Sequence, residues 1–191
     1  METKKAPLEG IRVLNLGGGW AGRVAAMLLA DQGAEVLEIE QPGREGQLED
    51  SMLARGKSVL RLNLKEAGGL EQARSLACAA DIVLDNLGPD RSSRFGLDYR
   101  SLRERNPALV YVSIPGFAED SELGQTAAWE GTVAAAVGVY TDIHALGPVL
   151  GGPPIFTALP MASAYGGVHA AIAAMTALVQ RLRSGVGQRI E

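Results

Sequence analysis

A strand, a glycine-rich turn, a helix and a second strand follow one another near the start of the chain, and this succession restricts the fold more than any other feature. Ile11–Leu16 is a short, mostly apolar run, which is typical of a buried strand. Ala21–Gln32 carries apolar residues at helical spacing, and Gly33 stands where a glycine commonly ends a helix. Glu35–Glu40 is the second strand. Together these pieces predict a βαβ unit with parallel strands and a right-handed crossover.

The turn in this unit matches the pattern G-x-G-x-x-G, with Gly17, Gly19 and Gly22 at the glycine positions. An acid, Glu40, follows eighteen residues after the last of them. One interpretation is a dinucleotide site, because such glycines let the backbone approach a pyrophosphate and the acid binds a ribose hydroxyl. The other interpretation is structural, since small residues are needed wherever a strand meets a helix closely. The spacing alone leaves both open.

The composition of the 191 residues excludes several classes of protein. A net charge of −4 provides no basic surface for nucleic acid or an anionic membrane. The single cysteine, Cys78, excludes an internal disulfide framework and is typical of a reducing cytoplasm. The two histidines, His144 and His169, are too few and too far apart to indicate a metal site. No segment is apolar over a length that would span a bilayer, so we expect a cytoplasmic protein without membrane or nucleic-acid partners.

Strands and helices continue to alternate through the first 118 residues. The further strands are expected at Ser58–Asn63, Asp81–Asp85 and Leu109–Ile114, and the helices at Lys65–Ala80, Asp90–Arg94 and Asp98–Arg105. This alternation predicts an α/β fold with a Rossmann-like, doubly wound parallel sheet. Ligands of such sheets bind outside the carboxyl ends of the strands. We therefore expect the Gly17–Gly19 turn, Gln41, the Asn86 loop and the Gly116 loop to meet on one rim.

The pattern changes after residue 118, and we expect residues 119–191 to be a helical continuation of the 1–118 core. Ala127–Tyr140 predicts one helix, and residues 142–154 are a Gly/Pro-rich linker. Pro160–Arg183 predicts a long apolar helix whose many small residues indicate close packing against another helix. The last residues, GQRIE, resemble the opening of a strand. This ending indicates that the chain is truncated at residue 191.

The order of these segments resembles the N-terminal part of the class III CoA-transferases, the CaiB/BaiF family, which also contains formyl-CoA transferases, carnitine CoA-transferases and α-methylacyl-CoA racemases. The resemblance rests on segments that span nearly the whole chain in order: PLEGIRVLNL, MLLADQGAEVLEIEQPG, RGKSVLRLNLK, ADIVLDNLGPDRSSRFGLDYRSLRERNPALVYVSIPGF, AAWEG and ALVQRLRSGVGQRIE. It covers about the first half of a family member. It implies a Rossmann-like large domain, CoA in place of NAD, and dimers whose two rings interlock.

On the family pattern, CoA or acyl-CoA is a substrate that lies along the rim, with no tightly bound cofactor and no metal. The resemblance assigns its contacts to residues matching Gly19, Gln41, Arg55, Lys57, Asn86, Leu87 and Arg94. Two of these depart from the pattern, since some members have Arg where Gln41 stands and many have Phe where Leu87 stands. Both changes weaken the expected contact, and a lost Arg–phosphate bond costs about 1.5–3 kcal/mol.

A larger departure concerns the reaction itself. The resemblance implies an Asp at the start of the long apolar helix, and Ser163 stands at that position. In the transferases this carboxylate attacks the acyl-CoA thioester to give a mixed anhydride, and the released CoA thiolate then attacks the side-chain carbonyl. A serine has no carbonyl for CoA to attack, so it cannot relay CoA. Glu130 matches an acid near the family's active site, although it also suits an exposed, dipole-favoured helix start.

The racemase branch uses a His/Asp pair to move a proton at the carbon next to the thioester carbonyl. Trp129 occupies the position of that histidine, and Ser163 that of the acid. His169 lies nearly two helical turns beyond Ser163. We expect it to be a packed or interface histidine.

Four hypotheses follow, in order of preference. The first is a class III CoA-transferase-like domain that binds CoA or acyl-CoA but lacks the transferring Asp. On this hypothesis the chain is an inactive half, which forms a homodimer or pairs with a second CoA-transferase half. The substrates are a CoA thioester and a carboxylic acid. The second is an active transferase with displaced chemistry, using Glu130 or a residue beyond Glu191. The third is an NAD-binding oxidoreductase domain built on the glycine turn and Glu40. The fourth is a non-catalytic interaction module.

Overall fold

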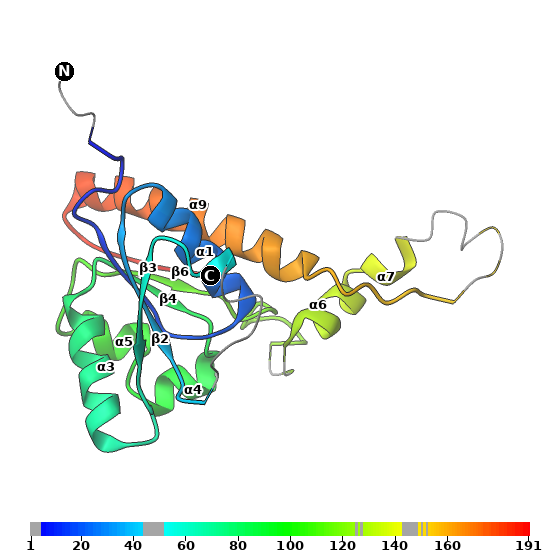
Figure 1. Ribbon diagram of the computed structural model, residues 1–191, viewed down its shortest axis with the longest axis horizontal. Helices are drawn as coiled ribbons and strands as arrows, with labels where there is room; N and C mark the ends of the chain where they lie inside the picture. Colours follow the sequence, from blue (N-terminus) through cyan, green and yellow to red (C-terminus); the bar gives the residue numbers. More distant parts are fainter. Residues whose placement is uncertain are drawn as a thin grey trace.

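The computed structural model describes residues 5–43, 52–124, 126, 128–142, 149, 151 and 153–191, and a six-stranded sheet forms its centre (Figure 1). The strands are β1 (Arg12–Asn15), β2 (Glu35–Glu40), β3 (Lys57–Arg61), β4 (Ile82–Asp85), β5 (Val110–Ser113) and β6 (Arg189–Ile190). The helices are α1 (Trp20–Asp31), α3 (Ala67–Ala79), α4 (Pro89–Arg94), α5 (Tyr99–Arg103), α6 (Glu130–Ala136), α7 (Val139–Asp142) and α9 (Met161–Ser184).

The strands lie in the order β3-β2-β1-β4-β5-β6, and every neighbouring pair is parallel. Residue Val13 of β1 is in register with Val36 of β2 on one side and with Ile82 of β4 on the other. This order is that of a Rossmann-like, doubly wound sheet, so the predicted fold class is confirmed. The order reverses between β1 and β4, and ligands of such sheets bind at that reversal.

Helices cover both faces of the sheet. On one face α1 and α9 pack over inward residues such as Val13, Ile82 and Val110. On the other face α3 and α5 pack over alternate strand residues such as Val83 and Tyr111. Because alternate strand residues point to opposite faces, a buried strand supplies both cores, which explains the consecutive apolar residues within β1, β4 and β5.

The close helix contact predicted from the small residues of α9 is made with α1. A Cβ at Gly167 would lie only 2.6 Å from Cβ of Val24 and 2.7 Å from the carbonyl oxygen of Ala21. The sequence-based statement that no segment could span a bilayer needs correction, because α9 is long and apolar enough by length and composition. One face of this helix is apolar because it is buried against α1 and the sheet.

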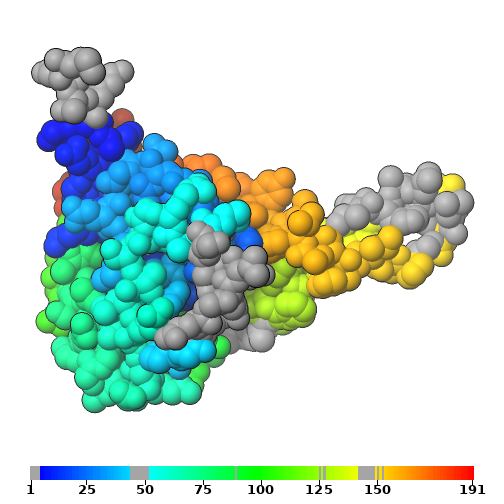
Figure 2. Space-filling model, viewed as in Figure 1, coloured from blue at the N-terminus to red at the C-terminus, as the bar shows by residue number. Residues whose placement is uncertain are grey.

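The segment between β5 and α9 differs from the expected single helix. Ala127 lies outside the described residues, and the helix is split into α6 and α7 at Gly138, whose φ of 79° lies in the left-handed region. Most of the expected 142–154 linker also lies outside the described residues. Figure 2 shows residues 153–160, which lead into α9, extending from the body of the molecule. The final strand was predicted correctly, since β6 pairs in parallel with β5, and the domain boundary at residue 118 stays a prediction.

Candidate functional site

A large cleft opens at the carboxyl ends of β1, β4 and β5, with a smaller pocket beside it. The cleft has a volume of about 1310 Å³, and its wall includes Gly19, Asn86 and Gly116. The side pocket has a volume of about 190 Å³, and Gly17 and Gln41 line it. The four loops expected to meet on one rim therefore do so.

Asn86 bridges the point where the strand order reverses. Its side-chain Nδ2 donates to the carbonyl oxygen of Ile114 at 2.9 Å, and its Oδ1 accepts from the backbone N–H of Gly22 at 3.4 Å. A Cβ at Gly19 would lie 1.9 Å from that same Oδ1, and a Cβ at Gly22 would lie 3.1 Å from Cβ of Asn86. The glycine pattern thus has a structural cause, because the space that the glycines leave is filled by the Asn86 side chain.

A network of opposite charges lies beneath the side pocket. Arg23 Nε is 2.8 Å from Glu38 Oε1, and Lys57 Nζ donates to Glu38 Oε2. Arg23 Nη2 also lies 3.8 Å from Glu40 Oε1. The side chains of Lys57 and Glu38 are fully buried, and burial lowers the pKa of the Lys57 ammonium despite its anionic partner. Arg23, Glu38 and Glu40 line the pocket from below, whereas Lys57 does not reach it.

Two of the predicted CoA contacts are not on the rim with the others. Arg55 donates to Asp31 through Nε at 3.0 Å and Nη2 at 2.6 Å, and it holds the pKa of that carboxyl below its ordinary value. Asp31 is the last residue of α1, so this pair lies at the end of the helix away from the rim. Lys57 begins β3 and is held by Glu38 inside the core. The geometry therefore does not bring Arg55 or Lys57 together with Asn86 and Arg94.

Glu130 meets the start of α9. Its Oε1 accepts from the backbone N–H of Ala162 at 2.9 Å, and its Oε2 accepts from the N–H of Ser163 at 2.7 Å. These are two of the amide groups that the first turn of a helix leaves without helical partners. A carboxylate there is also stabilised by the dipole of the 24-residue helix. Both Glu130 and Ser163 line the cleft.

The two ring residues near Ser163 are differently placed. Trp129 is 62% exposed at the start of α6, with its ring over Gly131. His169 is exposed and lines the cleft, so it is not packed inside this chain, and its place at an interface stays a prediction. Its Nδ1 lies 2.8 Å from the carbonyl oxygen of Tyr165. Because a carbonyl only accepts, the proton of this hydrogen bond is carried by Nδ1.

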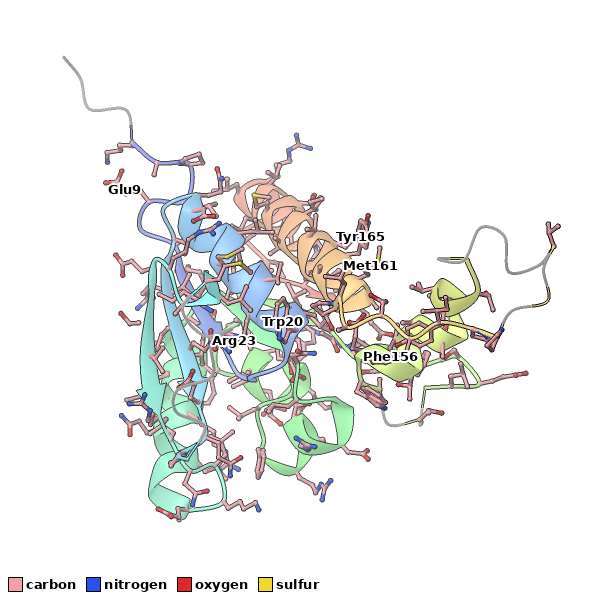
Figure 3. The ribbon with its side chains drawn as sticks, turned by 45° about the vertical axis from the view of Figure 1, so that its right-hand side comes forward. Glu9, Trp20, Arg23, Phe156, Met161 and Tyr165 are labelled. Atoms are coloured by element: carbon pink, nitrogen blue, oxygen red, sulfur yellow. The ribbon has the colours of Figure 1, made fainter. Side chains whose placement is uncertain are left out.

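Several lining residues were not singled out from the sequence. Among the residues expected on the rim, Arg94 lines the cleft and Leu87 lines both cavities. Arg91, one helical turn before Arg94, and Trp20 also line both cavities, and neither was singled out. Figure 3 shows Trp20 and Arg23 extending from the first turns of α1. Leu62 and Leu64 also line the side pocket, and their position just beyond the carboxyl end of β3 could have identified them. Among the described residues no group of His, Cys, Asp and Glu could hold a metal ion.

Comparison with known proteins finds relatives that are named as CoA-transferases. The family model described as CoA-transferase family III matches residues 8–191. The CoA-transferase/lyase DddD of Marinomonas is 39% identical over 193 residues, which are all of this chain and 23% of that protein. The succinate–glutarate CoA-transferase of Agrobacterium fabrum is 32% identical over 213 residues, covering all of this chain and 52% of the enzyme. The chain thus spans about half, or less, of the length of these relatives.

Solved structures agree. A CaiB/BaiF family protein from Brucella suis superposes with a TM-score of 0.82 at 27% identity, over 98% of this chain and 53% of that one. A Mycobacterium tuberculosis protein superposes with a TM-score of 0.83 at 30% identity, over 97% of this chain and 52% of that one. The strand order, the rim cavities and the match over residues 8–191 lead to one assignment: the chain belongs to CoA-transferase family III.

Proposed function

We propose that this chain is the CoA-binding half of a CoA-transferase, which receives CoA or acyl-CoA at the rim cleft but lacks the carboxylate that transfers CoA. The contact between Glu130 and Ser163 carries this proposal. Ser163 stands where the family pattern has Asp, and the nearby Glu130 has both oxygens bonded to backbone N–H groups. A carboxylate fixed by two such bonds is a stabilised anion, and hydrogen bonding to the charged form lowers its nucleophilicity.

Transfer of CoA requires a side chain that can carry it. A carboxylate attacks the thioester carbonyl, the CoA thiolate leaves, and the resulting anhydride is then opened by that thiolate to release the acid and leave CoA on the side chain. Ser163 could form an ester with the acyl group, but no carbon of serine can then hold CoA. The chain is therefore proposed to act with a second half that supplies the Asp, in the cytoplasm, on a CoA thioester and a carboxylic acid.

The relative lengths support a paired arrangement. The DddD relative matches 193 residues as 23% of its length, whereas the Agrobacterium enzyme matches 213 residues as 52%, so DddD is about twice as long. A protein of that length has room for two whole units of the Agrobacterium enzyme's length, which could pair with each other. The chain is also proposed to pair through its long helix, by association with such a half or with a second copy.

The outer face of α9 suits such a pairing. Five large apolar residues along it are spaced by three, four, seven and three residues: Tyr165, Val168, Ile172, Val179 and Leu182. They are exposed by 40% at Val168 to 83% at Leu182. This spacing is that of the a and d positions of a helix that packs along another helix. Sedimentation of the chain alone, and of a Val179→Glu variant outside the cleft, tests whether this stripe mediates self-association.

A second possible function is an active transferase that uses Glu130 in place of the missing Asp. This alternative is weaker because both carboxylate oxygens of Glu130 are bonded to backbone N–H groups. It predicts that the chain transfers CoA and that Glu130→Gln abolishes the transfer. A Glu130→Gln variant with full activity would count against it. CoA transfer by the isolated chain would contradict the proposed inactivity.

The NAD alternative is weakened by the surroundings of the glycine turn and of its acid. The Asn86 side chain fills the space beside Gly19 that a pyrophosphate would approach. Glu40 lies 3.8 Å from Arg23 and 3.9 Å from Arg61, which compete with a ribose hydroxyl for its carboxylate. An interaction module without a ligand, the last alternative, predicts that neither CoA nor NAD binds.

A titration of the chain with CoA, acetyl-CoA and NAD, followed by calorimetry and thermal unfolding, separates these functions. We expect CoA and acetyl-CoA to stabilise the fold by about 2.7 kcal/mol at a hundred times the dissociation constant, and NAD to have no effect. Arg91→Gln should weaken CoA binding about tenfold, because a charge-assisted phosphate contact is lost. Arg100→Gln, on the exposed surface of α5, is the matched control. Stabilisation by NAD but not by CoA would overturn the proposal.

A further inference from the structure

A buried acid and a buried tyrosine lie side by side where β4 and β5 reach the rim. Asp85, the last residue of β4, and Tyr111, in β5, are each only 2% exposed. Tyr111 Oη donates to Asp85 Oδ2 at 2.6 Å. The tyrosine ring is held from its other side by Tyr99, with ring centroids 5.9 Å apart. The pair is fixed by packing as well as by its hydrogen bond.

The second oxygen of Asp85 reaches forward into the loop. Its Oδ1 accepts from the backbone N–H of Leu87 at 2.8 Å. One carboxylate therefore connects β5 to the first turn of the loop that follows β4. Asn86, between the two, is tied separately to Ile114 and Gly22. Leu87 lines both cavities and Asn86 lines the cleft, so this loop forms the wall between them.

The fold itself does not require an acid at this position. Backbone pairing already joins β4 to β5, with Asp85 in register with Ser113. A buried carboxylate is costly unless hydrogen bonds compensate it, and burial raises the pKa of Asp85 against the bonds from Tyr111 and Leu87. Such a group is retained where it fixes a conformation. What it fixes here is the position of the Leu87 amide.

We propose that Asp85 and Tyr111 are positioning residues, which hold the loop of residues 86–88 in the shape that receives the CoA thioester in the cleft. This role rests on the proposed CoA binding. Neither side chain lines the cleft, and each acts through Leu87 and Asn86. The other groups that act on the pair are Ser92 of α4, Arg189 of β6 and Asp98 before α5. They are unchanged in the variants used to test it.

The test combines binding and amide exchange on the full chain. Tyr111→Phe keeps the ring and removes the hydroxyl, and Asp85→Asn keeps an acceptor for the Leu87 N–H. Tyr99→Phe removes a hydroxyl from the neighbouring ring and is the matched control. For each protein, CoA affinity is measured between pH 6 and 8 and divided by that of the wild type. This ratio cancels the titration of CoA itself.

We expect Tyr111→Phe to bind CoA about tenfold more weakly near neutral pH, since the acid loses a hydrogen bond that favours its anion. Its affinity ratio should fall further as the pH is lowered, because Asp85 then protonates more readily and accepts more weakly from Leu87. Asp85→Asn cannot ionise, so its ratio should stay flat with pH. Tyr99→Phe should match the wild type.

The Leu87 amide reports on the loop without ligand. We expect its hydrogen exchange to quicken in Tyr111→Phe and to be unchanged in Tyr99→Phe. Unchanged exchange and unchanged CoA affinity in Tyr111→Phe would overturn the inference, even if that variant melts at a lower temperature. If the wild type fails to bind CoA, the proposed function is refuted. The exchange of Leu87 then decides alone whether the pair fixes the loop.

Discussion

Removing the Glu130 carboxylate should loosen the start of α9 by an amount that its contacts determine. Glu130→Ala deletes two hydrogen bonds to backbone N–H groups, those of Ala162 and Ser163. Hydrogen bonds to a charged group contribute about 1.5–3 kcal/mol each, and a charge at a helix N-terminus about 0.3–1 kcal/mol. The site is only partly buried, so water replaces much of what is lost. We therefore expect a loss of about 2 kcal/mol, which is less than the sum of these contributions.

Urea unfolding at pH 7 measures the global loss, and amide exchange at Ala162 and Ser163 measures the local one. Glu130→Gln keeps one acceptor oxygen and no charge, so about half of the effect should remain. Glu122→Ala, at an exposed acid in a loop, should change stability by less than about 0.5 kcal/mol. The reasoning is refuted if Glu130→Ala unfolds at the same urea concentration as the wild type and both amides keep their protection.

Three further outcomes follow from contacts in the core. Gly19→Ala would place a methyl group 1.9 Å from Asn86 Oδ1. It should therefore lower the free energy of unfolding by about 1–3 kcal/mol, measured by thermal unfolding. Adding Asn86→Ala to the same chain should relieve most of the clash. Gly167→Ala should lower the free energy of unfolding by a similar amount, because its methyl group would clash with α1. The control is Gly68→Ala in α3, where an added Cβ meets nothing within 4 Å. It should leave the stability unchanged or raise it by up to about 1 kcal/mol. Because burial raises the pKa of Asp85 above its ordinary 3.8, ionising it costs folded-state stability. Asp85→Asn should therefore gain stability relative to the wild type as the pH rises from 4 towards 8, and an unchanged difference across that range would contradict the assigned direction.

The strands could be predicted from the sequence because their cause is local. Residues 82–84 and 109–112 are continuous apolar runs, since both faces of a parallel sheet are covered by helices. The structure shortens the predicted strands and helices by one or a few residues at most of their ends. By contrast, β3, α1 and α4 begin one residue earlier than predicted, and α9 ends one residue later. The rim then follows from the alternation alone, because a right-handed crossover brings all the carboxyl ends to one edge.

The placement of the charged residues could not be predicted in this way. The resemblance to the family assigned Arg55 and Lys57 to the CoA contact. Their positions depend on the pairing of β2 with β3, which sets Glu38 opposite Val59 and brings Lys57 within reach of its carboxylate. A long side chain can reach several partners, and its choice among them is a tertiary property. Likewise, only the folded chain shows that the acid at Glu130 meets the start of α9.

The glycine turn shows why a binding pattern and a catalytic residue need separate arguments. Gly19 and Gly22 are explained by Asn86, whose side chain occupies the space between β1 and β4 that another Rossmann-like protein could leave to a phosphate. The ends of the strands and the loops that follow them thus shape the rim. The family pattern has its transferring Asp at the start of α9, which is a different element. Under the proposed function, Ser163 takes the place of that carboxylate without disturbing the turn, the Asn86 bridge or the Asp85 anchor. Under the proposed function, this separation lets one half of a paired transferase keep the binding surface while the other half performs the transfer.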